Sequence, residues 1–284
     1  MKKTLREIWV LLKVSFRESK KDGLASIAAS LTYYLALSLA PLFYILLIIG
    51  GKIYEREAIQ NEVVYYLGRS VGSAPADFFQ NILLQSQNNS GNVWANVIGI
   101  MLLLYGAINF YLILDKSFRK IYGISLADSR HWIRKFFEKR LVSIFFLLGT
   151  AAVLIIMVFL NFAIAAFREY FKSLENISLT NYTLQIFNFL IAFIVIFFLF
   201  SVIYKILSDF KIKWRDVMTG ASISAFLFIV ANVILSIHFK FSTIGSFYGV
   251  GGSIILTLIW LYYSSQIFLF GGEIIKVHEK NLKT

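Results

Sequence analysis

The segment GLASIAASLTYYLALSLAPLFYILLIIG, residues 23–50, contains no charged side chain and is long enough to cross a membrane. A transmembrane helix needs about 20 apolar residues, because the hydrocarbon core of a bilayer is about 30 Å thick. The middle of this segment nevertheless contains serine, threonine and tyrosine side chains and a proline. Polar groups are costly in lipid, so we expect this side of the helix to face protein or a water-filled cavity.

The composition of the whole chain also indicates a membrane protein. Of its 284 residues, 58% are hydrophobic and 15% are charged, and the mean hydropathy is +0.71. Soluble proteins contain about 25% charged residues, so a soluble domain of this length would expose too much apolar surface. The chain has no cysteine, which excludes disulfides and cysteine metal sites.

Six uncharged apolar runs of transmembrane length predict an all-α bundle, a single polytopic membrane domain over residues 1–284. The runs are continuous rather than alternating, which argues against the strands of a membrane barrel. We also expect short amphipathic helices on the membrane surface, at residues 5–16 and in the long loop 52–92. The predicted spans are residues 24–51, 93–114, 141–167, 184–206, 217–237 and 250–272.

The basic residues lie on alternate sides of these six spans. The first 23 residues, the loops 115–140 and 205–216 and the C-terminal tail hold 22 of the 28 lysines and arginines, and the other loops hold 6. By the positive-inside rule, we expect both termini in the cytoplasm. Anionic lipid headgroups would attract this basic face, so the net charge of +12 does not require a nucleic-acid partner.

Small side chains form one row along the first predicted span. Ala25, Ala29, Thr32, Ala36 and Ala40 recur at the helical spacing of three and four residues. Such a row lets the backbone of another helix approach closely, so we expect it to be a packing face.

A second, polar row lies beside the first and contains Ser30, Tyr34, Ser38 and Pro41. Proline frees the carbonyl four residues earlier, which predicts a kink near Leu37. Helix packing with a proline bend is one interpretation of this row. The other is a pathway for a solute or a lipid headgroup.

Each of the five other spans carries an amide side chain. Hydrogen bonds between membrane helices contribute only about 0.6–2 kcal/mol, so packing explains any one of these amides alone. Their recurrence, together with several tyrosines, favours a partly hydrated interior. No ionisable residue lies at the centre of a span, which argues against a proton relay. The candidate pathway-lining residues are Ser30, Tyr33, Tyr34, Ser38, Asn109, Asn161, Asn188, Asn232 and Gln266.

Charged residues and glycines mark the ends of several spans. Asp115 is one helical turn before Arg119, so the two are expected to form an ion pair. The pair Gly271–Gly272 is expected to end the last span and to place Glu273 at the inner surface. The predicted charges at cytoplasmic ends are Asp115, Arg119, Lys205 and Glu273, and the candidate hinges are Pro41, Gly251 and Gly252.

Three stretches resemble the YihY / virulence factor BrkB family: AASLTYYLALSLAPL (28–42), LLYGAINFYLILDKSFRKIYG (103–123) and GSIILTLIWLYYSSQIFLFGGEI (252–274). The resemblance extends in order over nearly the whole chain. It implies an integral protein of the bacterial inner membrane, usually without an assigned substrate. The older label of this family is ribonuclease BN.

The residues do not support a nuclease. Metal-dependent hydrolysis of a phosphodiester needs clustered histidines or carboxylates. On the predicted topology His238 lies on the opposite side of the membrane from His131 and His278, and no closely spaced histidine pair occurs. We therefore expect no enzyme activity, no catalytic residues, no metal or cofactor, and no nucleic-acid partner.

The function that the sequence favours is that of a transporter, or of a protein that handles lipid or a small amphiphile. Its partners would be membrane lipids and an unknown small solute or lipid. A structural or assembly scaffold, possibly a homo-oligomer, is the alternative, and a membrane-bound ribonuclease is the least favoured. Tyrosine and amide side chains suit this function because they can hydrogen-bond a headgroup without a fixed charge.

Overall fold

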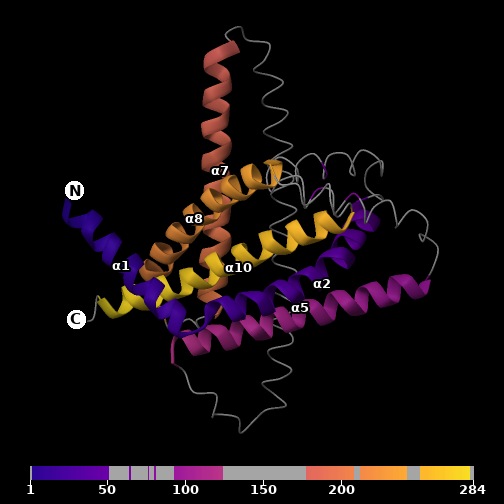
Figure 1. The fold of residues 1–284 in the computed structure, drawn as a ribbon, viewed down its shortest axis with the longest axis horizontal. Helices are drawn as coiled ribbons and strands as arrows, with labels where there is room; N and C mark the ends of the chain where they lie inside the picture. The colour runs from indigo at the N-terminus through magenta and orange to yellow at the C-terminus, as the bar shows by residue number, and fades with distance from the viewer. Residues whose placement is uncertain are drawn as a thin grey trace.

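The computed structural model describes residues 2–50, 93–123, 177–207, 212–241 and 250–281, together with Val64, Ala76 and Gln80. The long segments are helical, and no strand occurs among these residues, so the all-α prediction is confirmed for this part of the chain. The helices are α1 (Lys2–Lys21), α2 (Leu24–Gly50), α5 (Val93–Ile121), α7 (Ile177–Leu207), α8 (Trp214–Phe241) and α10 (Val250–Asn281) (Figure 1).

Four of these helices contain stretches that are long and apolar enough to cross a membrane: Val97–Ile121, Phe189–Leu207, Trp214–Phe239 and Gly252–Lys280. A shorter apolar stretch, Leu24–Leu39, lies in α2. The predicted span 141–167 and the pair of surface helices in the loop 52–92 fall outside the described residues. The number of six spans therefore stays a prediction.

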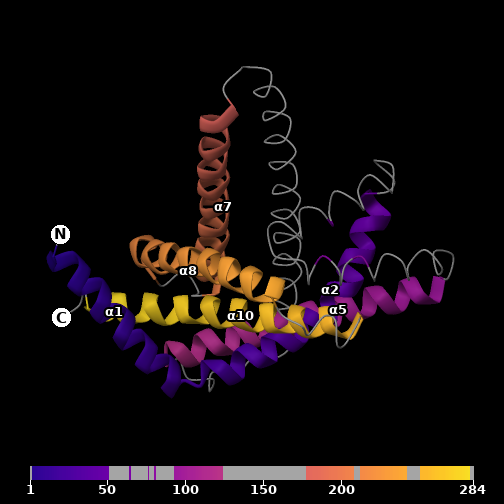
Figure 2. The same ribbon diagram turned by 45° about the horizontal axis from the view of Figure 1, so that its top comes forward.

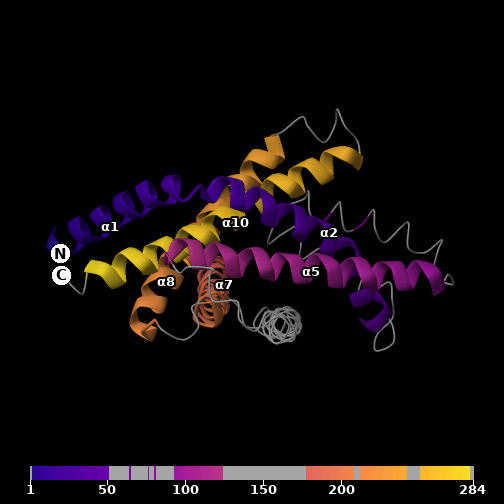
Figure 3. The same cartoon turned by 90° about the horizontal axis from the view of Figure 1, so that it is seen from below.

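Helix α10 lies at the centre of the arrangement and contacts α1, α2, α5 and α8. Helices α2 and α5 pack along each other, whereas α7 packs mainly on α8 and crosses α5 and α10 steeply (Figures 1 and 2). Both termini lie at the same end in all three ribbon views, as Figure 3 shows from below. We call this end, which contains the turn at residues 22–23 and residues 273–281, the terminal end.

Aromatic side chains dominate the core near the terminal end. Phe118 of α5, Tyr204 of α7 and Phe268 of α10 are buried, with ring centroids 4.7–6.1 Å apart. Lipid is as apolar as these side chains, so close packing rather than exclusion from water holds membrane helices together. Offset aromatic pairs at these distances contribute about 0.5–1.5 kcal/mol each. The cluster thus fastens three helices at one point.

Glycines allow the closest contacts between helices. The hydroxyl of Tyr204 donates a hydrogen bond to the carbonyl of Phe268 at 2.7 Å and lies 3.2 Å from Ser224 Oγ. A Cβ atom at Gly271 would lie 2.1 Å from that hydroxyl. At Gly106 of α5, a Cβ would lie 2.9 Å from the Cβ of Ser38 in α2. Both glycines therefore serve helix packing.

Only part of the predicted small row lies on the packing face. Ala25 and Ala29 are exposed and Thr32 is buried, while α2 packs through Leu24, Ala28 and Leu31. Helix α10 continues past Gly271 and Gly272 to Asn281, so these glycines do not end the helix. They fit against neighbouring side chains, and the end of the membrane span at residue 272 stays a prediction.

The amphipathic helix predicted at residues 5–16 is confirmed as α1. Leu11 is buried against Ile274 and Val277 of α10, while Trp9 and Phe16 on other faces are exposed. Exposed aromatic side chains on an amphipathic helix suit the membrane interface. The helix ends at Lys21, and Gly23 in the turn after it has a φ of +68°, in the left-handed region that glycine adopts without strain. That residue turns the chain from α1 into α2.

Candidate functional site

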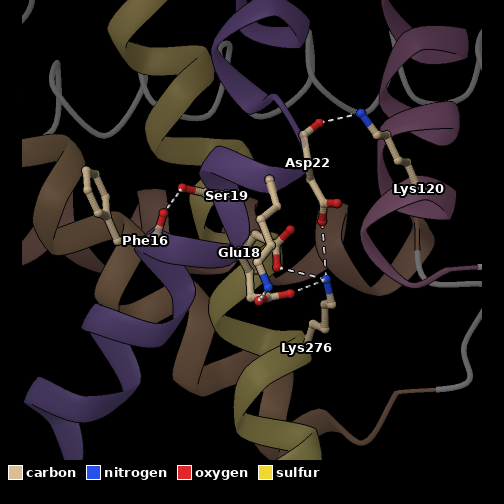
Figure 4. A network of polar contacts seen from close by, with 8 residues as sticks. Phe16, Glu18, Ser19, Asp22, Lys120 and Lys276 are labelled. Carbon is tan, nitrogen blue, oxygen red and sulfur yellow. Dashed lines mark hydrogen bonds and ion pairs between the residues drawn. The ribbon is translucent and has the colours of Figure 1, made fainter.

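A charged cluster joins α1 to α10 at the terminal end. The Lys276 ammonium lies 3.2 Å from Asp22 Oδ2, 3.2 Å from Glu273 Oε2 and 3.9 Å from Glu18 Oε2 (Figure 4). We call these four residues the carboxyl cluster. One cation thus contacts three carboxyl groups, two from the end of α1 and one from its own helix.

Two further lysines support the α1 side of the carboxyl cluster. Lys120 of α5 donates a hydrogen bond to the backbone carbonyl of Asp22, and Lys21 contacts Glu18 at 2.8 Å. The Lys21 ammonium holds the pKa of the Glu18 carboxyl below its usual value. Burial raises the pKa of Asp22, but the neighbouring Glu273 carboxyl and Lys276 ammonium outweigh it, so this pKa lies below its usual value.

Glu273 is the most enclosed member of the carboxyl cluster. Its side chain is 0% exposed, and neither carboxyl oxygen has a hydrogen-bond partner among the described residues. Its predicted position at the inner surface of the membrane stays a prediction. Helix α10 continues past Gly272 and α1 folds back over it, which encloses the carboxyl group between helices.

Other polar contacts fasten the remaining helices at this end. His278 Nδ1 lies 2.8 Å from the buried Asp216 carboxyl at the start of α8. The expected pair between Asp115 and Arg119 is present, with a shortest distance of 3.1 Å. Lys205 is buried and donates to the backbone carbonyl of Ile212. Every helix but α2 thus contributes a charged side chain to this end.

The structure brings three of the tyrosines together on the α2–α5 pair. The Tyr34 ring centroid lies 5.1 Å from that of Tyr33 and 6.2 Å from that of Tyr105. Tyr33 is 61% exposed and Tyr105 is 53% exposed, whereas Tyr34 between them is half-buried. Asn109, one turn from Tyr105, donates to its carbonyl at 2.8 Å. We call these three tyrosines the tyrosine face.

The other predicted pathway residues lie elsewhere. Ser30 is exposed and donates to the carbonyl of Ser26, while Ser38 is buried and donates to that of Leu35. Asn232 accepts a hydrogen bond of 2.6 Å from the Trp260 indole. The remaining predicted residues are Gln266, which is half-buried, Asn161, which lies outside the described residues, and Asn188, whose side chain does too.

The candidate hinges are in helical segments. Residue 41 lies within α2, whose axis bends along its length (Figure 2), although the structure does not describe the proline side chain. Gly251 and Gly252 lie in the first turn of α10. Their roles as hinges stay predictions.

An open hollow of about 510 Å³ lies between α7 and α8. Arg215, Met218, Thr219 and Ser222 line it from one face of α8, and Phe197 lines it from α7. The hollow therefore has a polar side, with a guanidinium and two hydroxyls, and an apolar side. This combination matches the two halves of an amphiphile.

The chain matches the family described as Virulence factor BrkB over residues 15–284. It belongs to that family. The resemblance found in the sequence is thereby confirmed.

Three relatives of this BrkB-family protein match over most of their length. The UPF0761 membrane protein of Idiomarina loihiensis is 25% identical, covering 92% of this chain and 88% of the relative. The ribonuclease-like protein YfkH of Bacillus subtilis is 24% identical, covering 90% of each chain. The UPF0761 membrane protein of Haemophilus influenzae is 22% identical, covering 95% of this chain and 94% of the relative. No solved structure matches.

Sequence analysis of the BrkB-family chain missed most of the carboxyl cluster. Glu273 and Lys276 are one turn apart on α10, a spacing that allows an ion pair and could have been noticed. The contact of Lys276 with Asp22 bridges 254 positions and has no local signal. Asp216 could have been singled out as an acidic residue in the first turn of a helix, where the dipole favours it.

Proposed function

We propose that this protein binds lipid or a small amphiphile within the membrane and moves it. The observation that carries this proposal is the tyrosine face. Tyr33 is nine residues from the start of α2, about 14 Å along the axis, and Tyr105 is sixteen residues from the end of α5, about 24 Å along it. Both phenols therefore lie well inside the apolar stretches and away from their ends.

Tyrosines at that depth are unusual because aromatic side chains with a polar group favour the two membrane interfaces. A phenol hydroxyl without a partner in hydrocarbon costs several kcal/mol, roughly. Two exposed phenols in contact with a third are better explained by a surface that meets water or a polar headgroup. Phenols can donate and accept hydrogen bonds, so they would suit an uncharged or zwitterionic headgroup.

The hollow between α7 and α8 supports the same proposal. Arg215 can bind a phosphate oxygen pair. The Thr219 and Ser222 hydroxyls beside it donate to backbone carbonyls of α8 and would have to rotate to donate to a phosphate. Phe197 and Met218 offer apolar surface for an acyl chain. Anionic membrane lipids are therefore the partner that we propose for this hollow.

Removing two phenol hydroxyls by Tyr34→Phe and Tyr105→Phe should slow lipid movement roughly tenfold, because each lost hydrogen bond weakens binding by about 0.5–1.5 kcal/mol. The measurement is protein-dependent flux of a fluorescent phospholipid in proteoliposomes. Tyr263→Phe, an exposed tyrosine on α10, is the matched control and should leave flux unchanged. Unchanged flux in the double variant, or loss of flux only through unfolding, contradicts the proposal.

We also propose that the protein is not a nuclease. The ribonuclease-like name belongs to the Bacillus subtilis relative. Among the described residues, no group of three or more histidine and acidic side chains is arranged to hold a metal ion. RNA added to the same proteoliposomes provides the check, and it should remain intact. Degradation that copurifies with the wild-type chain through several independent preparations would contradict this.

We propose that the chain resides in the inner membrane of a bacterium with both termini in the cytoplasm. The 22-to-6 division of basic residues supports this orientation, and the two termini lie at one end of the molecule (Figure 1). A tag inserted beside Asn88 should be accessible from outside intact cells. Tags at the termini serve as the comparison and should be shielded until the membrane is opened, and the reverse pattern would overturn the orientation.

A further inference from the structure

The three carboxyl groups of the carboxyl cluster lie around a single ammonium, that of Lys276. Glu18 has Lys21 as a close partner at 2.8 Å, and Asp22 accepts a hydrogen bond from Lys276 at 3.2 Å. Glu273 is fully enclosed 3.2 Å from the same ammonium, and neither of its carboxyl oxygens has a hydrogen-bond partner among the described residues. A carboxylate buried without hydrogen bonds is so unfavourable that the group takes up a proton instead.

We propose that Glu273 binds an exchangeable proton, and that loss of this proton releases Asp22 and the α1–α2 turn from α10. When Glu273 is protonated, the Lys276 ammonium interacts with only two carboxylates, those of Asp22 and Glu18. When Glu273 loses its proton, its carboxylate becomes a third negative charge that competes for the same buried ammonium. The proton is thus a ligand of the protein, and the Glu273 carboxyl group is its binding site.

The charged and titratable groups around Glu273 come from every helix that packs there. On α1 and the turn after it, these groups are two carboxyl groups and one lysine. On α5 and the turn after it, they are one lysine and one tyrosine. On α8 there is one carboxyl group, which contacts a histidine of α10. The hydroxyl of Tyr122 is buried and has no partner within the described segments. The groups are Glu18, Lys21, Asp22, Lys120, Tyr122, Asp216, Lys276, His278 and Glu279.

The turn at Asp22 and Gly23 is suited to move. Gly23 interrupts the helix between α1 and α2 with a left-handed φ. Asp22 beside it is joined to α5 through Lys120 and to α10 through Lys276 (Figure 4). Release of Asp22 would let α1 tilt about Gly23 while α2 stays packed on α5.

The sequence argued against a proton relay because no ionisable residue lies at the centre of a span. Glu273 is consistent with that observation, because it lies past the middle of α10 toward the terminal end. Burial by α1, rather than depth in the membrane, is what isolates it. The proton site does not depend on lipid movement. Its test can therefore fail while the proposed function stands, and the proposed function can fail while the proton site stands.

The test uses the purified full chain in lipid nanodiscs. At neutral pH, the infrared spectrum should contain the carbonyl stretch of a protonated carboxylic acid, which disappears at higher pH and is absent from Glu273→Gln. Labelling all glutamates with carbon-13 should shift that band, so the assignment does not depend on whether a variant folds. Glu7→Gln, an exposed glutamate on α1, should retain the band. Absence of a glutamate band from the wild type overturns the proposal.

Hydrogen exchange provides the second readout. After correction for the intrinsic effect of pH, amides around residues 19–27 should exchange faster in the wild type once the band is lost. In Glu273→Gln, which cannot lose a proton, the exchange of these amides should not change with pH. An equal increase in wild type and variant would show that Glu273 does not control the turn.

Discussion

Substituting Gly271 with alanine is expected to destabilise the protein by about 3 kcal/mol, the upper end of the range for an overpacked core. The added Cβ would lie 2.0 Å from Ser224 Oγ and 2.1 Å from the Tyr204 hydroxyl. Both atoms are buried, and each donates a hydrogen bond to a backbone carbonyl, Tyr204 to Phe268 at 2.7 Å and Ser224 to Gly220 at 2.8 Å, so moving either aside would disturb a buried hydrogen bond. Thermal unfolding in detergent, followed by the loss of soluble protein, measures the effect.

Gly272→Ala is the matched control for this prediction. Its Cβ would lie 3.1 Å from the nearest atom of the Phe118 ring, which a small shift of the ring relieves. Alanine also favours a helix over glycine by about 1 kcal/mol, which offsets part of that strain. We therefore expect a stability close to that of the wild type. Equal melting temperatures for the two alanine variants would contradict the assigned close contact at Gly271.

Lys276→Met should have the second large effect, a loss of about 3 kcal/mol in the free energy of unfolding. Removing one partner from a buried ion pair costs about 3–5 kcal/mol, because the other charge stays behind uncompensated. Here the lysine side chain is 11% exposed and contacts three carboxyl groups. Methionine keeps most of the side-chain volume, so the loss reports charge rather than packing. Lys116→Met, an exposed lysine on α5, is the control.

The pH dependence of this variant has a defined sign. The pKa of Asp22 is below its usual value in the folded protein, so its stabilisation is complete above about pH 4 and is lost as the pH falls through the folded pKa. Because Lys276 contributes to that lowered pKa, Lys276→Met should lose less stability on acidification than the wild type. A steeper acid loss in the variant would refute the role assigned to Lys276.

Hydropathy was sufficient to locate the described helices. The runs at 93–114, 184–206, 217–237 and 250–272 each lie inside a longer helix, because an uncharged apolar run has few alternatives to a helix in lipid. The ends were less predictable. Charged residues such as Glu273 and Lys276 ended the hydropathy signal, yet the hydrogen-bonded backbone continued through them to Asn281. Membrane depth and helix length are different quantities.

The candidate site was only partly predictable. Tyr34 and Asn109 were selected as polar groups in apolar segments, and the structure does place them on the paired α2 and α5 near Tyr105. By contrast, the contact of Asp22 with Lys276 depends on how α1 folds back onto α10. That path is set by Gly23 and by the burial of Leu11, which act at a distance that no periodicity encodes.

Helix α10 has 32 residues, about 48 Å of continuous helix, against a hydrocarbon thickness of about 30 Å. About a third of the helix must therefore lie outside the hydrocarbon core, or the helix must tilt. Tyr204 of α7 and Ser224 of α8 both contact α10 at Gly271, so the position of this long helix is fixed at that point by two neighbouring helices.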